Sequence, residues 1–316
     1  MDVNTGDFDP GQCFWIYRED GEPRACRRWL PDGPDAQLEI AIVPGLGEHT
    51  GRYIEFASRF TACGFAVTAM DLIGHGHSPG RFGCIHSYED LLTDVDTLVR
   101  FAGRLPTDES LRSPARTCKP IHLHELRSES PKIARPVFLF GHSMGGNLVL
   151  NAIMRRATIP AGAIASSPML RAVKPMSDAY LATARFLMKL MPNYRLKAPV
   201  KKEYLSRDTA QTAAYARDEL VHRFISLRLG AALIDSGLWV LEHPERLTIP
   251  TLLLHGLKDQ ITDAKASQEL AAKASENCSS VFFPDLLHDT HRDIGRNEFF
   301  RVVLDWLHAQ TTAFAG

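Results

Sequence analysis

A serine set between glycines offers the clearest chemistry in this chain. The pattern G-H-S-M-G at residues 141–145 follows an apolar run and precedes a helical pattern. In that context a sharp turn from strand to helix projects the serine hydroxyl from the sheet toward a general base. A glycine-rich turn whose serine only caps the helix is the structural alternative. The pattern therefore predicts Ser143 as the nucleophile of an acyl transfer, provided that suitable partners follow.

An acid and a histidine follow Ser143 in the chain order that such a site requires. A serine hydroxyl needs a base to take its proton, and the base needs an acid to fix its tautomer. Asp259 and His288 each come just past a later apolar run. Asp263 competes with Asp259 but is typical of a helix N-cap, and His291 competes with His288 but is better placed on the following turn. We therefore expect Ser143, Asp259 and His288 to form a triad.

The third requirement is a pair of backbone N–H groups for the negative charge that develops on the carbonyl oxygen. Met144, directly after the nucleophile, is expected to provide one of them. The glycine-rich loop after the third apolar run, Pro44-Gly45-Leu46-Gly47, is expected to provide the other through Leu46. The sequence thus predicts an oxyanion hole built by Leu46 and Met144.

Short β-rich runs alternate with helical patterns along the chain. This alternation is typical of an α/β fold with a mostly parallel sheet and helices on both faces, whose ligands lie beyond the carboxyl ends of the strands. The expected strands are 14–18, 24–30, 38–43, 65–71, 136–140, 162–166, 251–255 and 280–284. The expected helices are 51–62, 88–103, 145–156, 263–274 and 296–309.

Two segments interrupt this alternation. Residues 104–135 are rich in proline and mixed charge and predict an irregular insertion. Residues 169–246 look helical throughout and predict a cap over the strand ends, so that 1–168 and 247–316 form the core. Around Phe186 and Leu190 the cap is more apolar than a solvated surface helix, which is compatible with an acyl-chain tunnel or a shallow membrane contact.

Composition excludes several function classes. A formal net charge of −1 over 316 residues gives no electrostatic case for binding nucleic acid. No apolar run approaches the roughly 18–20 residues that a membrane-spanning helix needs, and the acidic, polar start does not resemble a secretory signal. The six cysteines lack metal-type or disulfide-type spacing. We expect a soluble cytoplasmic protein, with peripheral membrane contact through the cap.

The remaining histidines predict no metal site. His75 and His77 lack third and fourth ligands at a recognisable spacing and are typical of a structural turn. His122 and His124 lie in the irregular insertion, where solvation is expected. Triad chemistry requires neither a metal nor a cofactor, so none is expected.

Three segments together resemble one branch of a known superfamily. Residues 44–53 (P-G-L-G-E-H-T-G-R-Y) are similar to its H-G-x-G-E-H-S-x-R-Y, residues 71–80 to its D-x-x-G-H-G-x-S-x-G, and residues 141–146 match its G-H-S-M-G-G. Ser167-Pro168, the run leading to Asp259 and the H-x-x-H loop also fit. The chain thus resembles the monoacylglycerol lipase and lysophospholipase branch of the α/β-hydrolases over about residues 12–310, a fold with eight strands and a nucleophile after the fifth.

The resemblance implies the same triad and the same oxyanion donors, with Tyr215 lining a pocket for the leaving alcohol. His142, beside the nucleophile, either touches the polar part of the substrate or packs in the core. The chain departs from the family at Pro44, where a histidine is usual. Since the donor is a backbone group one residue beyond Gly45, the chemistry is expected to survive, while loop geometry and alcohol preference are open.

The function expected from these observations is hydrolysis of a single-chain lipid ester, a monoacylglycerol or a lysophospholipid, through an acyl-enzyme. The triad does not select the leaving group, so a short-chain esterase, a thioesterase or an aminopeptidase of the same fold remains open. Epoxide hydrolases and dehalogenases place aspartate where this chain has Ser143. A non-catalytic ligand-binding protein of this fold is disfavoured because all three triad members are present.

Overall fold

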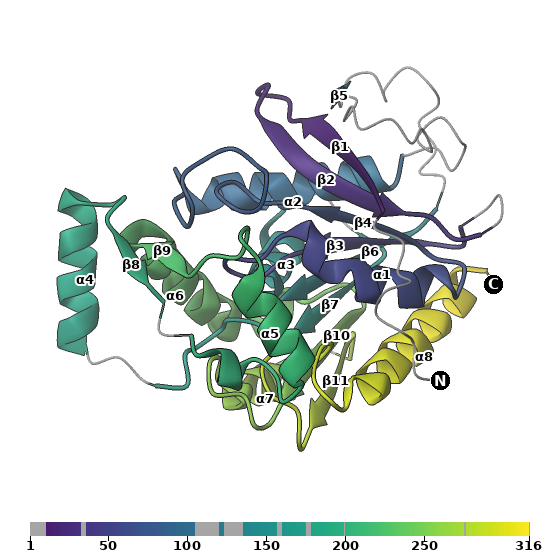
Figure 1. Cartoon of the computed structure of the whole chain (residues 1–316). Coiled ribbons are helices and arrows are strands. Elements are labelled where there is room, and N and C mark those ends of the chain that lie inside the picture. The colour runs from purple at the N-terminus through teal and green to yellow at the C-terminus, as the bar shows by residue number, and fades with distance from the viewer. Residues whose placement is uncertain are drawn as a thin grey trace.

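The computed structural model describes residues 11–32, 36–104, 120–122, 135–156, 160–174, 178–198, 200–274 and 276–315. In this part of the chain a nine-stranded sheet is the framework, with the strand order β11-β10-β7-β6-β3-β4-β2-β1-β5 (Figure 1). The strands are β1 (Gln12–Tyr17), β2 (Pro23–Trp29), β3 (Glu39–Val43), β4 (Ala66–Met70), β5 (Pro120–His122), β6 (Val137–His142), β7 (Gly162–Ser166), β10 (Thr251–Gly256) and β11 (Cys278–Phe283).

Strands β3, β4, β6, β7, β10 and β11 run parallel, and β2 pairs antiparallel with both β1 and β4. All eight expected strands are present, with ends that differ by at most two residues. The ninth, β5, was not expected, because it lies within the proline-rich insertion, where it pairs parallel with β1. Residues 105–119 and 123–134 of that insertion, including His124, lie outside the described residues.

Two hydrophobic cores lie on opposite faces of the sheet because successive side chains of a strand point to opposite sides. On β6, Val137 and Leu139 face one core, while Phe138 and Phe140 face the other. On β3, Ala41 and Val43 are likewise on the side opposite to Ile40 and Ile42. Burial on both faces explains why these strands are continuous apolar runs in the sequence.

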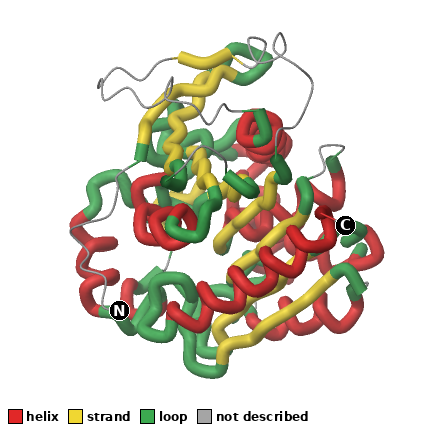
Figure 2. The backbone as a smooth tube through the Cα atoms, turned by 90° about the vertical axis from the view of Figure 1, so that its right-hand side faces the viewer, coloured by secondary structure: helices red, strands yellow, loops and turns green. Residues whose placement is uncertain are grey.

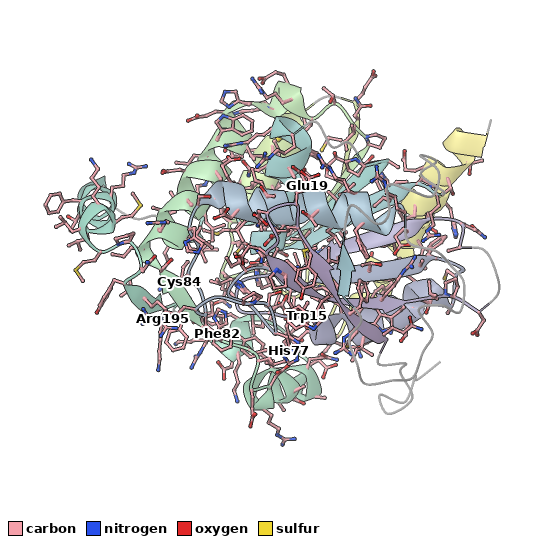
Figure 3. The ribbon with its side chains drawn as sticks, turned by 90° about the horizontal axis from the view of Figure 1, so that it is seen from above. Trp15, Glu19, His77, Phe82, Cys84 and Arg195 are labelled. Carbon is pink, nitrogen blue, oxygen red and sulfur yellow. The ribbon has the colours of Figure 1, made fainter. Side chains whose placement is uncertain are left out.

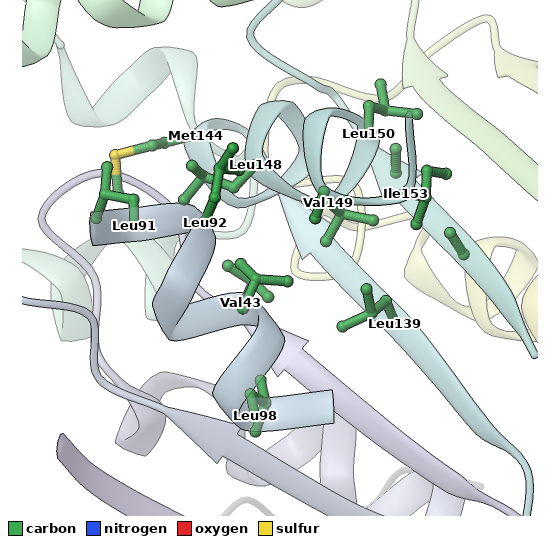
Figure 4. Close-up of a cluster of buried hydrophobic side chains, with 14 of the residues drawn as sticks. Val43, Leu91, Leu92, Leu98, Leu139, Met144, Leu148, Val149, Leu150 and Ile153 are labelled. Carbon is green, nitrogen blue, oxygen red and sulfur yellow. The ribbon is translucent and has the colours of Figure 1, made fainter. Parts of the chain in front are cut away.

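Helices cover each face. Helices α2 (Tyr88–Ala102) and α3 (Met144–Arg155) pack on the first face, with Leu91, Leu98, Leu148 and Val149 against Val43 and Leu139 (Figure 4). Helix α7 (Ala264–Lys273) contributes to the same core through Leu270. Helices α1 (Ile54–Thr61) and α8 (Arg296–Ala315) cover the second face, and α8 runs across the strands toward the C-terminus (Figure 2).

The predicted cap segment is mostly helical and lies between β7 and β10. Its helices are α4 (Asp178–Leu190), α5 (Thr209–Arg217) and α6 (Leu227–Glu242). The expectation of helix throughout is wrong at two places, since β8 (Arg195–Lys197) and β9 (Phe224–Ser226) form an antiparallel pair. In Figure 1, β8, β9 and α6 separate α4 from the sheet.

Because the central strands are parallel, their carboxyl ends meet at one edge of the sheet. The loops after β3, β6, β7, β10 and β11 therefore converge there, and they carry the predicted oxyanion loop, nucleophile, acid and histidine. None of the helices that the structure describes is both long enough and apolar enough to cross a membrane.

Candidate active site

Ser143 occupies a strained turn between β6 and α3. Its backbone has φ 55° and ψ −114°, a conformation that costs a non-glycine residue on the order of 1–3 kcal/mol. Its N–H donates to the Ser166 carbonyl (2.9 Å), and its own carbonyl accepts from the Met169 N–H (3.0 Å). One bond to the end of β7 and one to the loop after it thus hold the turn, and Ser143 is half-buried among buried neighbours.

Glycines on both sides of Ser143 allow the turn to pack closely. A Cβ at Gly141 would overlap the Gly145 carbonyl, and a Cβ at Gly145 would overlap the Val43 carbonyl at the end of β3. The G-x-S-x-G pattern is therefore required sterically. The contact between Gly145 and Val43 also places the nucleophile turn directly beside the loop that follows β3.

Asp259 and His288 contact each other on the loops after β10 and β11. The Nδ1–H of His288 donates to Asp259 Oδ2 across 2.7 Å, and both side chains are buried. The other carboxylate oxygen of Asp259 accepts the N–H groups of Ile261 (2.7 Å) and Thr262 (3.1 Å). The carboxylate is thereby fixed by its own turn and can hold the histidine in one tautomer.

The environment sets the charges of this pair. Burial alone would raise the pKa of Asp259, but the charge of His288 and hydrogen bonds from His255 and His288 hold the pKa below its usual range. Burial opposes protonation of His288, but the Asp259 carboxylate outweighs it and raises the pKa of the imidazole. The pair is therefore suited to take up a proton on His288 while Asp259 stays ionised.

The loop after β7 connects the histidine to the nucleophile turn. Ser167 adopts φ 43°, and its hydroxyl donates to the His288 carbonyl (2.9 Å). The preceding Ser166 accepts from the Ser143 N–H, and its hydroxyl lies 2.7 Å from that of Thr290. The ring of His142, next to the nucleophile, lies 4.8 Å from the ring of His288. These contacts connect the turn of Ser143 to the Asp259–His288 pair through Ser166, Ser167 and His142.

Asp263 and His291, the alternatives to Asp259 and His288, make other contacts. Asp263 caps α7 by accepting from the Lys265 N–H (3.0 Å). His291 is buried and stacks on Tyr53 with ring centroids 5.5 Å apart, and neither of its nitrogens has a hydrogen-bond partner among the described residues. Burial and the charge of Arg292 hold the pKa of His291 well below its ordinary value, so the ring is neutral. Neither residue belongs to the Asp259–His288 pair.

The two predicted oxyanion donors lie on adjacent segments. Gly45 packs against His142, and its N–H donates to Glu48 Oε2 (3.1 Å). Met144 is the first residue of α3, where the helix dipole adds positive potential. No hydrogen-bond acceptor is recorded among the described residues for the N–H of Leu46 or Met144. Both amides are thus available to a substrate oxygen.

A cluster of buried charged side chains packs against the loops of the site. Glu48 accepts from the Tyr53 hydroxyl (2.8 Å), Arg52 Nε (3.0 Å) and Arg292 Nη1 (2.7 Å). Burial would raise the pKa of Glu48, but Arg292 and Arg52 hold it well below the ordinary value, so the acid is ionised. Asp289 in turn lies 3.1 Å from His142 Nε2. The cluster joins the oxyanion loop to the loop after β11 that carries His288, here called the histidine loop.

A polar cavity of about 200 Å³ adjoins this cluster. Its lining combines residues of the loop after β3, helix α5 and the histidine loop: Gly51, Arg52, Glu55, Phe56, Gln211, Ala214, Asp218, His291 and Arg292. Tyr215 lies beside it, with the Arg52 guanidinium 4.9 Å above its ring. Burial raises the pKa of Tyr215 to about 12, so its hydroxyl stays protonated and can donate.

The structure does not bring two of the predicted substrate-binding residues to this place. Phe186 and Leu190 lie on α4 and are 62% and 64% exposed. Helix α4 stands at the margin of the molecule in two perpendicular views (Figures 1 and 3). In this structure these two side chains face outward and line no acyl-chain tunnel. His142 contacts His288, with ring centroids 4.8 Å apart, and Tyr215 packs against Arg52 at the cavity.

One group of residue types that can bind metal occurs among the described residues. Ligand atoms of His142, His288 and Asp289 lie within 4.8 Å of one another. Hydrogen bonding already explains their proximity, since His288 binds Asp259 and His142 binds Asp289. His75 binds the Ile73 carbonyl in its turn. The expectation that no metal or cofactor takes part stays a prediction.

Sequence reasoning did not identify several residues of the site. Ser167, Thr262, Asp289 and Arg292 act through contacts between loops that are far apart in the chain. The only signal in the sequence is that two of them follow His288 within four residues. In addition, Ser166 is the last residue of β7, and Ser167 follows it at the edge of the sheet where sites of this fold lie.

A model of the family described as serine aminopeptidase, S33, matches residues 34–111 and 120–295. The chain belongs to this family. Human monoglyceride lipase is 28% identical over 306 residues, which cover 95% of this chain and 91% of that protein. A monoacylglycerol lipase of Paleococcus ferrophilus, known from a crystal structure, is 28% identical with a TM-score of 0.75 and covers 91% of this chain and 99% of its own.

An uncharacterized abhydrolase domain-containing protein of Dictyostelium discoideum is 28% identical over 295 residues, and the match spans 92% of this chain but 28% of that protein. The family match and the lipase relatives confirm the resemblance to the monoacylglycerol lipase branch, and the likeness to solved structures confirms the α/β-hydrolase fold. The family and these relatives make the chain a carboxylic ester hydrolase.

The raised pKa of His288 predicts the acid limb of the pH profile. The base must be neutral to accept a proton, so kcat/KM for p-nitrophenyl acetate should rise with pH through an apparent pKa above 6.5, the ordinary histidine value. Asp259→Asn should lower kcat by a factor on the order of 10³–10⁴ because the tautomer is no longer fixed. Asp263→Asn, the matched control, should leave kcat and the apparent pKa of the acid limb unchanged. A limb at or below 6.5 would contradict the assigned pairing.

Proposed function

We propose that this enzyme releases a fatty acid from a monoacylglycerol through an acyl-enzyme on Ser143. The observation that carries the proposal is the buried Asp259–His288 pair, which is connected to the strained turn of Ser143 through His142 and the Ser166–Ser167 segment. Such a pair supplies the oriented base that a serine hydroxyl needs. The names of the relatives, monoglyceride lipase and monoacylglycerol lipase, support the substrate class.

The first half of the reaction forms the acyl-enzyme. Ser143 Oγ attacks the ester carbonyl while His288 Nε2 takes the hydroxyl proton, and the N–H groups of Leu46 and Met144 stabilise the resulting oxyanion. When the tetrahedral intermediate collapses, the C–O bond to the alcohol breaks. The imidazolium returns its proton to the leaving alkoxide oxygen, so that glycerol departs as a neutral alcohol.

The second half repeats these steps with water. His288 takes a proton from a water molecule, whose oxygen attacks the acyl carbonyl, and the same two amides hold the oxyanion. The bond to Ser143 Oγ then breaks, and His288 returns the proton to the serine. A fatty acid leaves and the free enzyme is restored.

We assign the leaving alcohol to the cavity beside the Glu48 cluster, and the charge balance there favours a neutral alcohol over a phosphate. Its lining carries two guanidinium groups, Arg52 and Arg292, and two carboxylates, Glu55 and Asp218. Both arginines already bind Glu48, at 3.0 and 2.7 Å. No excess positive charge remains to offset the desolvation of a phosphate, whereas hydroxyl groups can exchange hydrogen bonds with these polar side chains. A monoacylglycerol therefore fits better than a lysophospholipid.

A substrate panel tests this function. We expect Ser143-dependent hydrolysis of long-chain monoacylglycerols with kcat/KM at least about tenfold above that of lysophosphatidylcholine, since a charged group poorly matched by its site costs more than about 1.4 kcal/mol. Short p-nitrophenyl esters, an acyl thioester and an aminoacyl amide complete the panel, with Ser143→Ala as the control. A preference for the short ester, the thioester or the amide would contradict the lipase proposal but not the proposed triad.

The exposed face of the cap supports delivery of the substrate from a lipid surface. Helix α4 and the turn after it expose a continuous set of apolar side chains: Phe186, Leu187, Leu190, Met191 and Tyr194. Side chains of this kind enter the boundary between headgroups and acyl chains, where a monoacylglycerol resides. We propose that α4 contacts the lipid surface and does not line the acyl site.

Two substitutions on α4 test this surface. Transfer of each large apolar side chain from water stabilises binding by about 1.5–3 kcal/mol, so Phe186→Ser with Leu190→Ser should lower kcat/KM on monoacylglycerol in phosphatidylcholine vesicles by tenfold or more. Hydrolysis of p-nitrophenyl acetate in solution should not change. The matched control is Ile294→Ser, which changes an apolar residue that is outside the cap and 63% exposed. It should affect neither assay. Equal losses in both assays would contradict a surface role.

A further inference from the structure

Part of the cap rests directly on the oxyanion loop. The His222 N–H donates to the Gly47 carbonyl (3.1 Å), and a Cβ at Gly47 would overlap the His222 carbonyl. Gly47 has φ 72°, in the left-handed region that favours glycine. The residue after Leu46 thus takes its conformation in close contact with the cap.

A second contact joins the same two segments. The Gly51 N–H donates to His49 Nδ1 (3.2 Å), so the proton of the neutral ring is on Nε2, which donates to Asp218 Oδ2 (2.7 Å). The other oxygen of Asp218 accepts from the Leu220 N–H (3.1 Å) within the cap. The carboxylate therefore ties the turn that begins at Asp218 to the end of the oxyanion loop.

This part of the cap is itself anchored to the core. His222 Nε2 contacts the Gly74 carbonyl (3.1 Å), and its ring stacks on Phe82 with centroids 4.7 Å apart. Arg195 Nη1 donates to the Phe82 carbonyl (3.2 Å), and Figure 3 shows these two residues side by side. The Ser226 N–H donates to the Gly83 carbonyl (2.8 Å). The loop after β4 thus fixes the cap segment that holds the oxyanion loop.

Leu46 lies between two restraints of different origin. On its N-terminal side the core holds Gly45 through Glu48, and on its C-terminal side the cap holds Gly47 through His222. The amide that is to donate to the oxyanion is the one between Gly45 and Leu46. Donors that stabilise a transition state must be in place before the reaction, since their reorientation would cost part of the stabilisation.

We propose that Asp218 and His222 are positioning residues that hold the Leu46 amide at the oxyanion. This inference rests on the proposed function and extends it, because it assigns part of the cap to the chemical step. The cap then matters for every ester, including those whose acyl chain is too short to reach it. Its contribution belongs to kcat and not to the binding of the substrate.

The test uses p-nitrophenyl acetate, whose acyl group is a single acetyl unit. Asp218→Ala should lower kcat about tenfold or more while KM changes less than about threefold, because a misplaced oxyanion donor weakens transition-state stabilisation. Asp218→Asn should recover most of the loss, since its amide oxygen still accepts from His49. Asp235→Ala is the matched control, because it removes a cap carboxylate whose contact, with Arg185, lies away from the loop.

Asp218 also lines the polar cavity, so a double-mutant cycle isolates its contact with His49. His49→Ala should reproduce the loss in kcat, and the double variant should be no slower than either single variant. Rates are expressed per active site titrated to completion with a fluorophosphonate, so that unfolded protein does not count.

The possible failures are distinguishable. A wild type without Ser143-dependent hydrolysis would overturn the proposed function and this inference with it. An active wild type whose kcat survives Asp218→Ala would overturn the inference alone. The inference alone is also overturned if the loss is confined to KM or to long-chain esters, or if the losses of His49→Ala and Asp218→Ala add.

Discussion

The left-handed backbone of Ser143 is the constraint on which the rest of the site depends. A conformation that costs about 1–3 kcal/mol persists only if its surroundings hold it. Here the Ser166 carbonyl and the Met169 N–H bind the turn, and the Val43 carbonyl at the end of β3 packs against Gly145. The same strand order that provides these contacts also sets the positions of the acid and histidine loops. The parallel sheet thus holds the turn of Ser143 and the loops that carry Asp259 and His288 at one edge.

A cluster of buried charged side chains lies beside this turn. Glu48 is central, because its carboxylate binds the oxyanion loop at Gly45 and the histidine loop at Arg292. Buried groups of this kind are costly unless they are fully paired, and here each one contacts a partner of opposite charge. The cluster therefore fixes the distance between two loops that come from opposite ends of the chain.

The sequence was sufficient for eight of the nine sheet strands that the structure describes and for the contact between Asp259 and His288. The strands buried on both faces are continuous apolar runs. Asp259 follows such a strand, β10, and His288 follows the edge strand β11, which ends in an apolar run. The contacts of Ser167, Asp289 and His222 were not predictable, because each joins segments that only the tertiary fold brings together. The strands β8 and β9 escaped notice because three residues are too short to show a period. Phe186 and Leu190 were correctly seen as unusually apolar, but periodicity does not tell an outer face from an inner one.

The central claim is that His288, paired with Asp259, activates Ser143, and the rate of labelling by a fluorophosphonate tests it most directly. The account predicts covalent labelling of wild type that Ser143→Ala abolishes. His288→Ala should slow it by a factor on the order of 10³ or more, whereas His291→Phe, which keeps the ring stack on Tyr53, should stay within about tenfold of wild type. Labelling that survives Ser143→Ala, or that is lost with His291 and retained without His288, would contradict the account.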